Sequence, residues 1–378
     1  MNVLFCAIPG YGHVLPLVPL AQACKGQGYT TTFATGQSMV GRLPVNTVNG
    51  FPDWSLSEAE AETKRRHPEL AELSPQERYR FAVELFAGVT AECFVNGLDG
   101  VLDMVAPDLV VYDVLAVGAV LAALSRDIPS ICLGVIGWSF FTELLHRTVA
   151  ERQELATSSG PLGHAYLDQF PPSMWPPDVV SPPNTHSLRP VPARTTDAVL
   201  PSWLREPQQR TRVYLTLGTV AFGATEALEA ALDVLDDGDV EVLVAVGPEG
   251  DPSRLRKRSE RVHFETFVDQ ASVLPLVDAV VHHGGTGTML SAMAAGLPQV
   301  VMPQGADQFQ NASSLTATGA GRPVLPQSPE GALADAIHAA LTDPTMKESA
   351  ERMSVEIGAM PPPATVAADL PRLIEAVP

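Results

Sequence analysis

The chain alternates short apolar runs with stretches in which apolar residues recur every three or four positions. Residues 3–8 form the first apolar run, and residues 17–24 carry apolar side chains at helical spacing before Gly26 and Gly28 end the pattern. Residues 29–34 form the next apolar run. Because strand, helix and strand follow in order, this stretch predicts a βαβ unit with parallel strands and a right-handed crossover.

The alternation continues after a charged region, residues 54–102, in which an apolar stripe at helical spacing indicates helices. Apolar runs at 107–112 and 129–135 predict buried strands, and an apolar helix is expected between them at 117–124. The first block of the chain therefore has the pattern of a parallel sheet covered by helices.

A second block of the same kind follows residues 160–207, where prolines break every periodic pattern and indicate a linker with irregular loops. In this second block the predicted strands are 212–217, 240–246, 261–264, 279–282 and 299–302, and the predicted helices are 226–235, 328–341 and 345–357. The pattern predicts an α/β protein of two domains. They are residues 1–200, with a proline-rich linker from about residue 171, and residues 201–360, followed by a tail helix at 361–378.

Length and charge narrow the class of protein. A chain of 378 residues is too long for one domain with a single hydrophobic core, and its length fits two domains of about 150 to 200 residues each. With 43 acidic against 24 basic side chains the net charge is −19, which argues against nucleic acid or an anionic membrane as a partner. We expect a soluble cytoplasmic protein, and the sequence leaves its oligomeric state open, a homodimer included.

Neither the apolar segments nor the cysteine spacing indicates a signal peptide, a membrane-spanning helix, a disulfide framework or a zinc site. The N-terminus lacks a basic region before its apolar run, which argues against a signal peptide. The apolar stretch 109–124 contains Asp113 and is shorter than the roughly 20 residues that a membrane-spanning helix needs. The cysteines are too widely spaced to indicate a disulfide framework or a zinc site: Cys6, Cys24, Cys93 and Cys132.

Residues 280–296, VVHHGGTGTMLSAMAAG, have the pattern of a strand, a tight glycine-rich loop and a helix. Glycine allows the backbone to turn with positive φ and to approach a ligand, and the first amides of a helix attract an anion. The two adjacent histidines before the loop favour a phosphate-binding site over a plain strand-to-helix turn, and we call this site the phosphate seat. No lysine follows the last glycine, so this is not a Walker loop.

A second candidate site lies at the ends of two predicted strands. His13 falls in the first loop after a strand, and Asp113 ends the strand PDLVVYD. The carboxyl ends of neighbouring parallel strands meet at one edge of a sheet, where ligands of such folds bind. A carboxylate on one ring nitrogen would fix the tautomer and leave the other nitrogen to accept a proton. Spacing alone leaves open whether the two residues pair.

Three segments resemble the bacterial GT-B glycosyltransferases of family 1 that attach sugars to antibiotics and related natural products. They are GYGHVLPLVPLA, PDLVVYD and VVHHGGTGTMLSAMAAGLPQVVMPQGADQFQNA, and they occur in the order that the family has. The resemblance implies two Rossmann-like domains that face across a cleft. It also implies an acceptor in the amino-terminal half, a nucleotide sugar in the other half, and metal-independent inversion at the anomeric carbon.

The resemblance assigns roles to individual residues. His13 matches the general base and Asp113 the acid that orients it. In the turn Gly218-Thr219, Thr219 matches a Ser or Thr near the donor phosphate. The remaining matches to donor-binding positions are His283 on phosphate, the diphosphate loop Gly285, Thr286, Gly287 and Thr288, Phe267 and Val268 at the base, and Asp307 and Gln308 on sugar hydroxyls. Asp307 would at the same time suit an N-cap of the helix that follows it.

The expected acceptor is large, apolar and uncharged or cationic, because aromatic residues gather in the half that would hold it. The candidate acceptor contacts are Trp138, Phe140, Phe141 and Phe81, although Phe81 also belongs to an apolar stripe that favours plain core packing.

The donor is expected to be a nucleotide diphosphate sugar, with no cofactor and no metal. The plant branch of the family has a Glu three residues after the last Thr of the loop, on the ribose hydroxyls, where this chain has Ser291. That departure favours thymidine diphosphate (TDP) over uridine diphosphate (UDP), because the deoxyribose of TDP lacks the 2′-hydroxyl. Asp237-Gly238-Asp239 has a DxD spacing, but its polar surroundings indicate a solvated turn.

Two other functions remain open at this point. A sugar-nucleotide epimerase shares the fold and the phosphate seat, and a non-catalytic partner of a glycosyltransferase would keep both. A dinucleotide oxidoreductase is disfavoured, because Gly10-Tyr11-Gly12 is not followed by the third glycine of that fingerprint.

Overall fold

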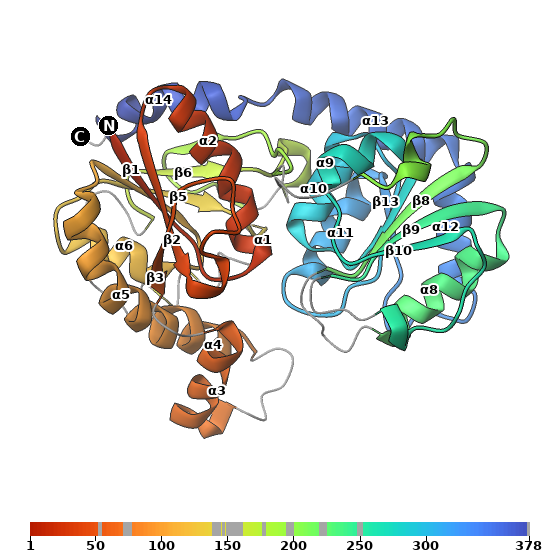
Figure 1. The fold of residues 1–378 in the computed structure, drawn as a ribbon, viewed down its shortest axis with the longest axis horizontal. Helices are drawn as coiled ribbons and strands as arrows, with labels where there is room; N and C mark the ends of the chain where they lie inside the picture. The colour runs from red at the N-terminus through yellow and green to blue at the C-terminus, as the bar shows by residue number, and fades with distance from the viewer. Residues whose placement is uncertain are drawn as a thin grey trace. The chain divides into compact units, whose positions relative to one another are not determined.

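The computed structural model describes residues 1–51, 55–70, 78–137, 145, 148, 162–175, 179–193, 200–218, 225–247 and 252–375. The chain divides into two compact units (Figure 1). The N-terminal unit comprises Met1–Gln169, Asp178–Leu188 and Pro361–Pro378, and the C-terminal unit comprises Phe170–Pro177 and Arg189–Met360.

The N-terminal unit contains a parallel sheet of seven strands among the described residues, in the order β3-β2-β1-β4-β5-β6-β7. Its strands are β1 (Asn2–Cys6), β2 (Thr30–Gly36), β3 (Thr47–Phe51), β4 (Leu109–Asp113), β5 (Ser130–Gly134), β6 (Ala165–Asp168) and β7 (Thr185–Ser187). Its helices are α1 (Tyr11–Val14), α2 (Val18–Gly26), α3 (Leu56–Arg66), α4 (Arg78–Val83), α5 (Thr90–Val105), α6 (Val117–Leu124) and α14 (Pro363–Glu375).

Strands β6 and β7 correct the prediction that residues 160–207 are only linker and loops. Neither strand contains a proline, and β6 is buried along its whole length beside β5. The prolines of this region flank the two strands, where they leave the backbone hydrogen bonds of the sheet intact.

The prolines near the N-terminus lie where a helix tolerates them. Pro16 is in the first turn of a short 3-10 helix, and Pro19 is in the first turn of α2. First-turn amides have no partner inside a helix, so a missing N–H costs nothing there.

A continuous helical stretch, Arg80–Val105, is long and apolar enough to cross a membrane by length and composition, and nearly half of its apolar window is buried within the protein. It includes a π-helical segment, Glu84–Val89, and then α5, which packs against α6 and β3. A Cβ atom at Gly118 of α6 would lie 2.2 Å from the carbonyl oxygen of Ala91, so α5 and α6 are in close backbone contact. This packing is that of a helix in the core of a folded unit.

The C-terminal unit contains a parallel sheet of six strands among the described residues, in the order β10-β9-β8-β11-β12-β13. Its strands are β8 (Thr211–Thr216), β9 (Val240–Ala245), β10 (Val262–Glu265), β11 (Ala279–His282), β12 (Gln299–Val301) and β13 (Gly321–Pro323). Its helices are α8 (Thr225–Asp237), α9 (Gln270–Val273), α10 (Thr286–Ala294), α11 (Gln308–Thr318), α12 (Ala332–Thr342) and α13 (Pro344–Ala359).

Helix α12 begins four residues later than its pattern predicts. Gly331 occupies the N-cap position with φ +86°, a left-handed conformation that turns the chain into the helix and that glycine adopts without strain.

Two boundaries differ from the predicted domains. Ser173 bonds Glu356 of α13, with its amide at 2.9 Å and its hydroxyl at 2.7 Å, and the Arg189 guanidinium donates to the Met360 carbonyl at 3.0 Å. The segments before residue 200 that hold these residues therefore belong to the C-terminal unit. The predicted tail is helix α14, which packs against α2 in the N-terminal unit (Figure 1).

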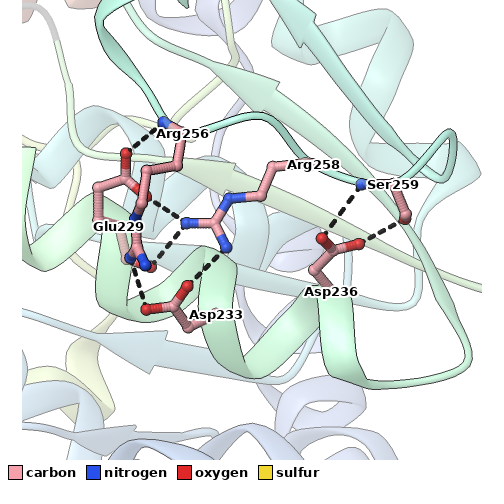
Figure 2. A network of polar contacts seen from close by, with 6 residues as sticks. All are labelled: Glu229, Asp233, Asp236, Arg256, Arg258 and Ser259. Carbon is pink, nitrogen blue, oxygen red and sulfur yellow. Dashed lines mark hydrogen bonds and ion pairs between the residues drawn. The ribbon is translucent and has the colours of Figure 1, made fainter.

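Figure 2 shows how α8 holds the segment that leads into β10. Arg258 is 7% exposed and pairs with both Glu229 and Asp233 of α8, the latter at 2.6 Å. Arg256 pairs with the same two carboxylates, at 3.0 and 2.6 Å. The network is nearly balanced in charge, so it can be buried on the Arg258 side without an unpaired ion.

We expect Arg258→Ala to lower the free energy of unfolding by about 2 kcal/mol, because the Glu229 carboxylate, only 14% exposed, loses its buried cation and keeps only the exposed Arg256. Chemical denaturation measures the change. The control is Arg210→Ala, whose partner Asp239 is 83% exposed, and it should cost less than about 1 kcal/mol. Equal losses in the two variants would contradict the assignment.

Candidate active site

His13 and Asp113 lie together at the carboxyl edge of the N-terminal sheet. Strands β1 and β4 are neighbours, with Cys6 in register with Tyr112, so the residues that follow β1 meet the end of β4. The distance from His13 Nδ1 to Asp113 Oδ2 is 2.9 Å. His13 belongs to the one-turn helix α1 rather than to a loop, and that turn carries its ring back over the strand ends.

This arrangement defines the chemistry of the imidazole. The Asp113 side chain is fully buried, and its other oxygen accepts a hydrogen bond from the Leu115 amide at 3.0 Å. A carboxylate at this distance from Nδ1 favours a proton on that nitrogen and leaves Nε2 as the nitrogen that can accept one. The His13 side chain is 21% exposed, and it can therefore be reached by a substrate.

The predicted phosphate seat has the expected strand, loop and helix. Strand β11 ends at His282, and α10 begins at Thr286 after the loop of Gly284 and Gly285. The N-cap residue of α10 is Gly285, which has no side chain to cap the first amides. These amides and the positive end of the helix dipole are suited to an anion.

His283 is enclosed by two glycines of the seat. A Cβ atom at Gly218 would lie 2.6 Å from His283 Cε1, and one at Gly285 would lie 2.4 Å from Nε2. Any larger residue at either position would displace the ring. Burial lowers the pKa of His283 to about 4, while the Thr216 backbone acts in the opposite direction. The ring is neutral at pH 7, so it can serve an anion as an N–H donor.

Asp307 does not cap its helix as its position suggests. It stands at the N-cap of α11, but its side chain makes no capping bond there. Instead, Oδ2 accepts hydrogen bonds from the Thr286 hydroxyl at 3.0 Å and from Asn311 Nδ2 at 2.9 Å. Thr286 thus directs its hydroxyl at Asp307, which leaves its backbone amide as the group that could bind an anion at the start of α10.

Gln308 also bonds within its own loop. Its Oε1 accepts hydrogen bonds from the amides of Gln304 at 2.7 Å and Gly305 at 3.1 Å. Gln308, which was expected to bind sugar hydroxyls, therefore holds the loop before α11 closed.

Gln270 links the base side of the predicted donor site to the phosphate side. Its Nε2 donates to the Thr288 hydroxyl at 3.1 Å. It follows Phe267 and Val268, which are half-buried and buried, and Asp269 caps the start of α9. Neither Gln270 nor Asn311 was predicted from the sequence. Asn311 lies inside the third segment that carries the family resemblance, and Gln270 lies three residues after Phe267.

Several predicted positions do not enter the described site. Thr219, Trp138, Phe140 and Phe141 lie outside the described residues. Phe81 packs with a cluster formed by Ala59, Leu85 and Val89, and the Lys64 ammonium lies 5.9 Å from its ring centre. These contacts are those of core packing, and contact of Phe81 with an acceptor stays a prediction.

The DxD run occupies the turn between α8 and β9, as its polar surroundings indicate. Asp239 is exposed and pairs with Arg210 at 2.9 Å. Within the described ranges, no group of three or more His, Cys, Asp or Glu side chains is placed to hold a metal ion.

Comparison with known proteins places the chain in a family. The model of the N-terminal domain of erythromycin biosynthesis protein CIII-like proteins matches residues 55–218, and that of the C-terminal domain matches residues 229–373. The L-demethylnoviosyl transferase of Streptomyces niveus is 31% identical, over 98% of this chain and 97% of that protein. This chain is an EryCIII-like antibiotic glycosyltransferase.

Solved structures agree with this glycosyltransferase assignment. SnogD of Streptomyces nogalater is 29% identical with a TM-score of 0.79, over 99% of both chains. VinC in complex with DTDP is 25% identical with a TM-score of 0.79, over 99% of this chain and 100% of that one. The two parallel sheets with flanking helices therefore constitute a GT-B fold, and the enzyme is a transferase rather than the epimerase considered from sequence.

Two histidines of the seat, His282 and His283, predict a loss of stability in acid. Burial lowers the pKa of His282 to about 3 and that of His283 to about 4, from the ordinary value of 6.5. Between pH 6.5 and about 4 the unfolded chain binds protons that the folded chain does not. Stability should therefore be independent of these groups above pH 6.5 and fall below it, by about 1.4 kcal/mol per pH unit for each histidine.

Urea denaturation from pH 7.5 to 4.5 measures this dependence. The His283→Asn variant should lose less stability over that range than the wild type, whereas a control at the exposed His338, His338→Asn, should follow the wild type. Identical pH profiles for the wild type and His283→Asn would refute the assignment.

Proposed function

We propose that this glycosyltransferase moves a deoxysugar from a TDP-sugar to a hydroxyl of an apolar natural product, with inversion and without a metal ion. The observation that carries the proposal is the His13–Asp113 pair, in which a fully buried carboxylate holds a partly exposed imidazole at 2.9 Å. Such a pair is suited to general base catalysis near neutral pH.

The reaction follows from that pair. His13 Nε2 accepts the proton of the acceptor hydroxyl while the hydroxyl oxygen attacks the anomeric carbon. A bond forms between that oxygen and the carbon, and the bond from the carbon to the diphosphate oxygen breaks on the opposite face. The configuration therefore inverts, and Asp113 stabilises the imidazolium that results.

The diphosphate leaves with more negative charge than it had in the donor. Uncapped amides at the start of α10, the Thr288 hydroxyl and neutral His283 supply hydrogen-bond donors for that charge. We infer that these groups take the place that a divalent metal has in other transferases.

Two observations support TDP as the nucleotide. Ser291 is 8% exposed on α10, at the position where the plant branch has a carboxylate for the ribose hydroxyls. The relative VinC was solved with DTDP. A deoxyribose without a 2′-hydroxyl requires no carboxylate at that position.

We expect His13→Ala to lower kcat by at least about 100-fold, because the acceptor proton loses its base. Mass spectrometry of reactions with a panel of TDP-sugars and aromatic or polyketide acceptors measures product, and free TDP should appear only when an acceptor is present. In His13→Ala, the affinity for TDP should stay within about twofold of wild type. In the control His338→Ala, both kcat and the affinity for TDP should stay within about twofold of wild type. Full activity in His13→Ala would exclude His13 as the base.

Thermal shift tests the choice of nucleotide. A ligand at 100 times its dissociation constant stabilises a protein by about 2.7 kcal/mol, so the tighter nucleotide raises Tm more at equal concentration. We expect TDP to raise Tm more than UDP does. A larger shift with UDP would refute the TDP assignment and leave the catalytic pair untouched.

A further inference from the structure

Gly284 is the point at which the phosphate seat turns from strand to helix. Its φ is +93°, in the left-handed region, and it connects the end of β11 to the N-cap of α10. Its backbone N–H donates to His282 Nδ1 at 3.0 Å, and its carbonyl accepts from Asn311 Nδ2 at 2.9 Å. Both polar groups of this one residue are therefore held by side chains.

His282 is fixed in one tautomer by its neighbours. Because Nδ1 accepts the Gly284 hydrogen bond, the ring proton must be on Nε2, which lies 2.8 Å from Gln299 Oε1. His282 and Gln299 are both fully buried. The ring thus bridges β12 and the loop backbone, and it points away from the surface that a ligand could reach.

Asn311 holds the loop from the other side. It is 1% exposed on α11, and its Nδ2 lies 2.9 Å from the Gly284 carbonyl, 3.1 Å from the Thr286 hydroxyl and 2.9 Å from Asp307 Oδ2. A single amide group therefore ties the turning residue, the first residue of α10 and the carboxylate of the next loop together.

Packing leaves no room for a side chain at Gly284. A Cβ atom there would lie 2.9 Å from Val301 Cγ1 and 3.1 Å from the Gln308 carbonyl oxygen. The backbone at this residue is thus confined by packing on one side and by two hydrogen bonds, and the amides that follow inherit its orientation.

We propose that His282 and Asn311 are positioning residues for the donor diphosphate: they hold Gly284 from both sides and so aim the first amides of α10, without touching the donor. The inference rests on the proposed function, which puts the diphosphate at this helix end. It separates the two adjacent histidines into His283, which faces the ligand, and His282, which faces the protein.

The reason is preorganisation. An anion seat made of backbone amides binds tightly only if the amides already point at the ligand, because ordering them during binding reduces affinity. Loosening Gly284 should weaken binding of the β-phosphate most, since that group depends on the helix-end amides. Recognition of the nucleobase, near Phe267 and Gln270, should change little.

Calorimetric titration of the full chain with TDP and with thymidine monophosphate (TMP), well below Tm, tests this role. His282→Leu and Asn311→Leu should raise the Kd for TDP at least tenfold and the Kd for TMP less. His282→Asn, whose side-chain oxygen can accept the Gly284 hydrogen bond in place of Nδ1, should keep the Kd for TDP within about threefold. It also keeps the test available if the Leu variants do not fold.

The control is Ser349→Ala, which removes another buried hydrogen bond of the C-terminal unit, from the Ser349 hydroxyl to the Thr345 carbonyl at 2.8 Å. It should lower Tm and leave both Kd values unchanged. Leu variants that lose Tm but bind TDP as the wild type does, or a tenfold loss of TDP affinity in His282→Asn, would overturn the inference. A wild-type protein that does not bind TDP would instead overturn the proposed donor, and the inference with it.

Discussion

Parallel pairing of neighbouring strands sets the position of the candidate catalytic pair and of the phosphate seat in this glycosyltransferase. Pairing of β1 with β4 brings the turn that carries His13 onto Asp113. Pairing of β8 with β11 puts Thr216 in register with His282, so that the next residues of both strands meet and the His283 ring lies against Gly218. Two unrelated pieces of chemistry therefore depend on the same rule, that parallel strands end at one edge.

The proposed phosphate seat relies on neutral hydrogen-bond donors rather than on charged side chains. The protein as a whole has a net charge of −19, so long-range attraction does not favour a diphosphate. Backbone amides, a threonine hydroxyl and a neutral imidazole act only at contact distance, where the general acidity of the surface matters little. In the proposed site, affinity therefore depends on how accurately the loop is positioned, and the buried side chains of His282 and Asn311 are bonded to that loop.

Sequence patterns predicted most of the sheet strands, because the alternation of apolar runs is a local property. The pairing of His13 with Asp113 was left open by spacing and was expected only from the family resemblance. The patterns failed at β6 and β7, where flanking prolines masked short strands that only the completed sheet stabilises. The partners of Asp307 were also missed, since a cap is a local expectation whereas Thr286 is brought to it by folding. The roles of Thr219 and of the aromatic residues from Trp138 onward stay predictions.

The path of the chain between the units has a consequence for protein engineering. Segments 170–177 and 189–193 belong to the unit that holds the proposed phosphate seat, and α14 belongs to the unit that holds His13. A chimera that exchanges donor halves between relatives by a single cut near residue 200 would separate Arg189 from the Met360 carbonyl and α14 from α2. A chimera that preserves both cores takes residues 189–360 and the 170–177 segment from one parent and keeps α14 from the other.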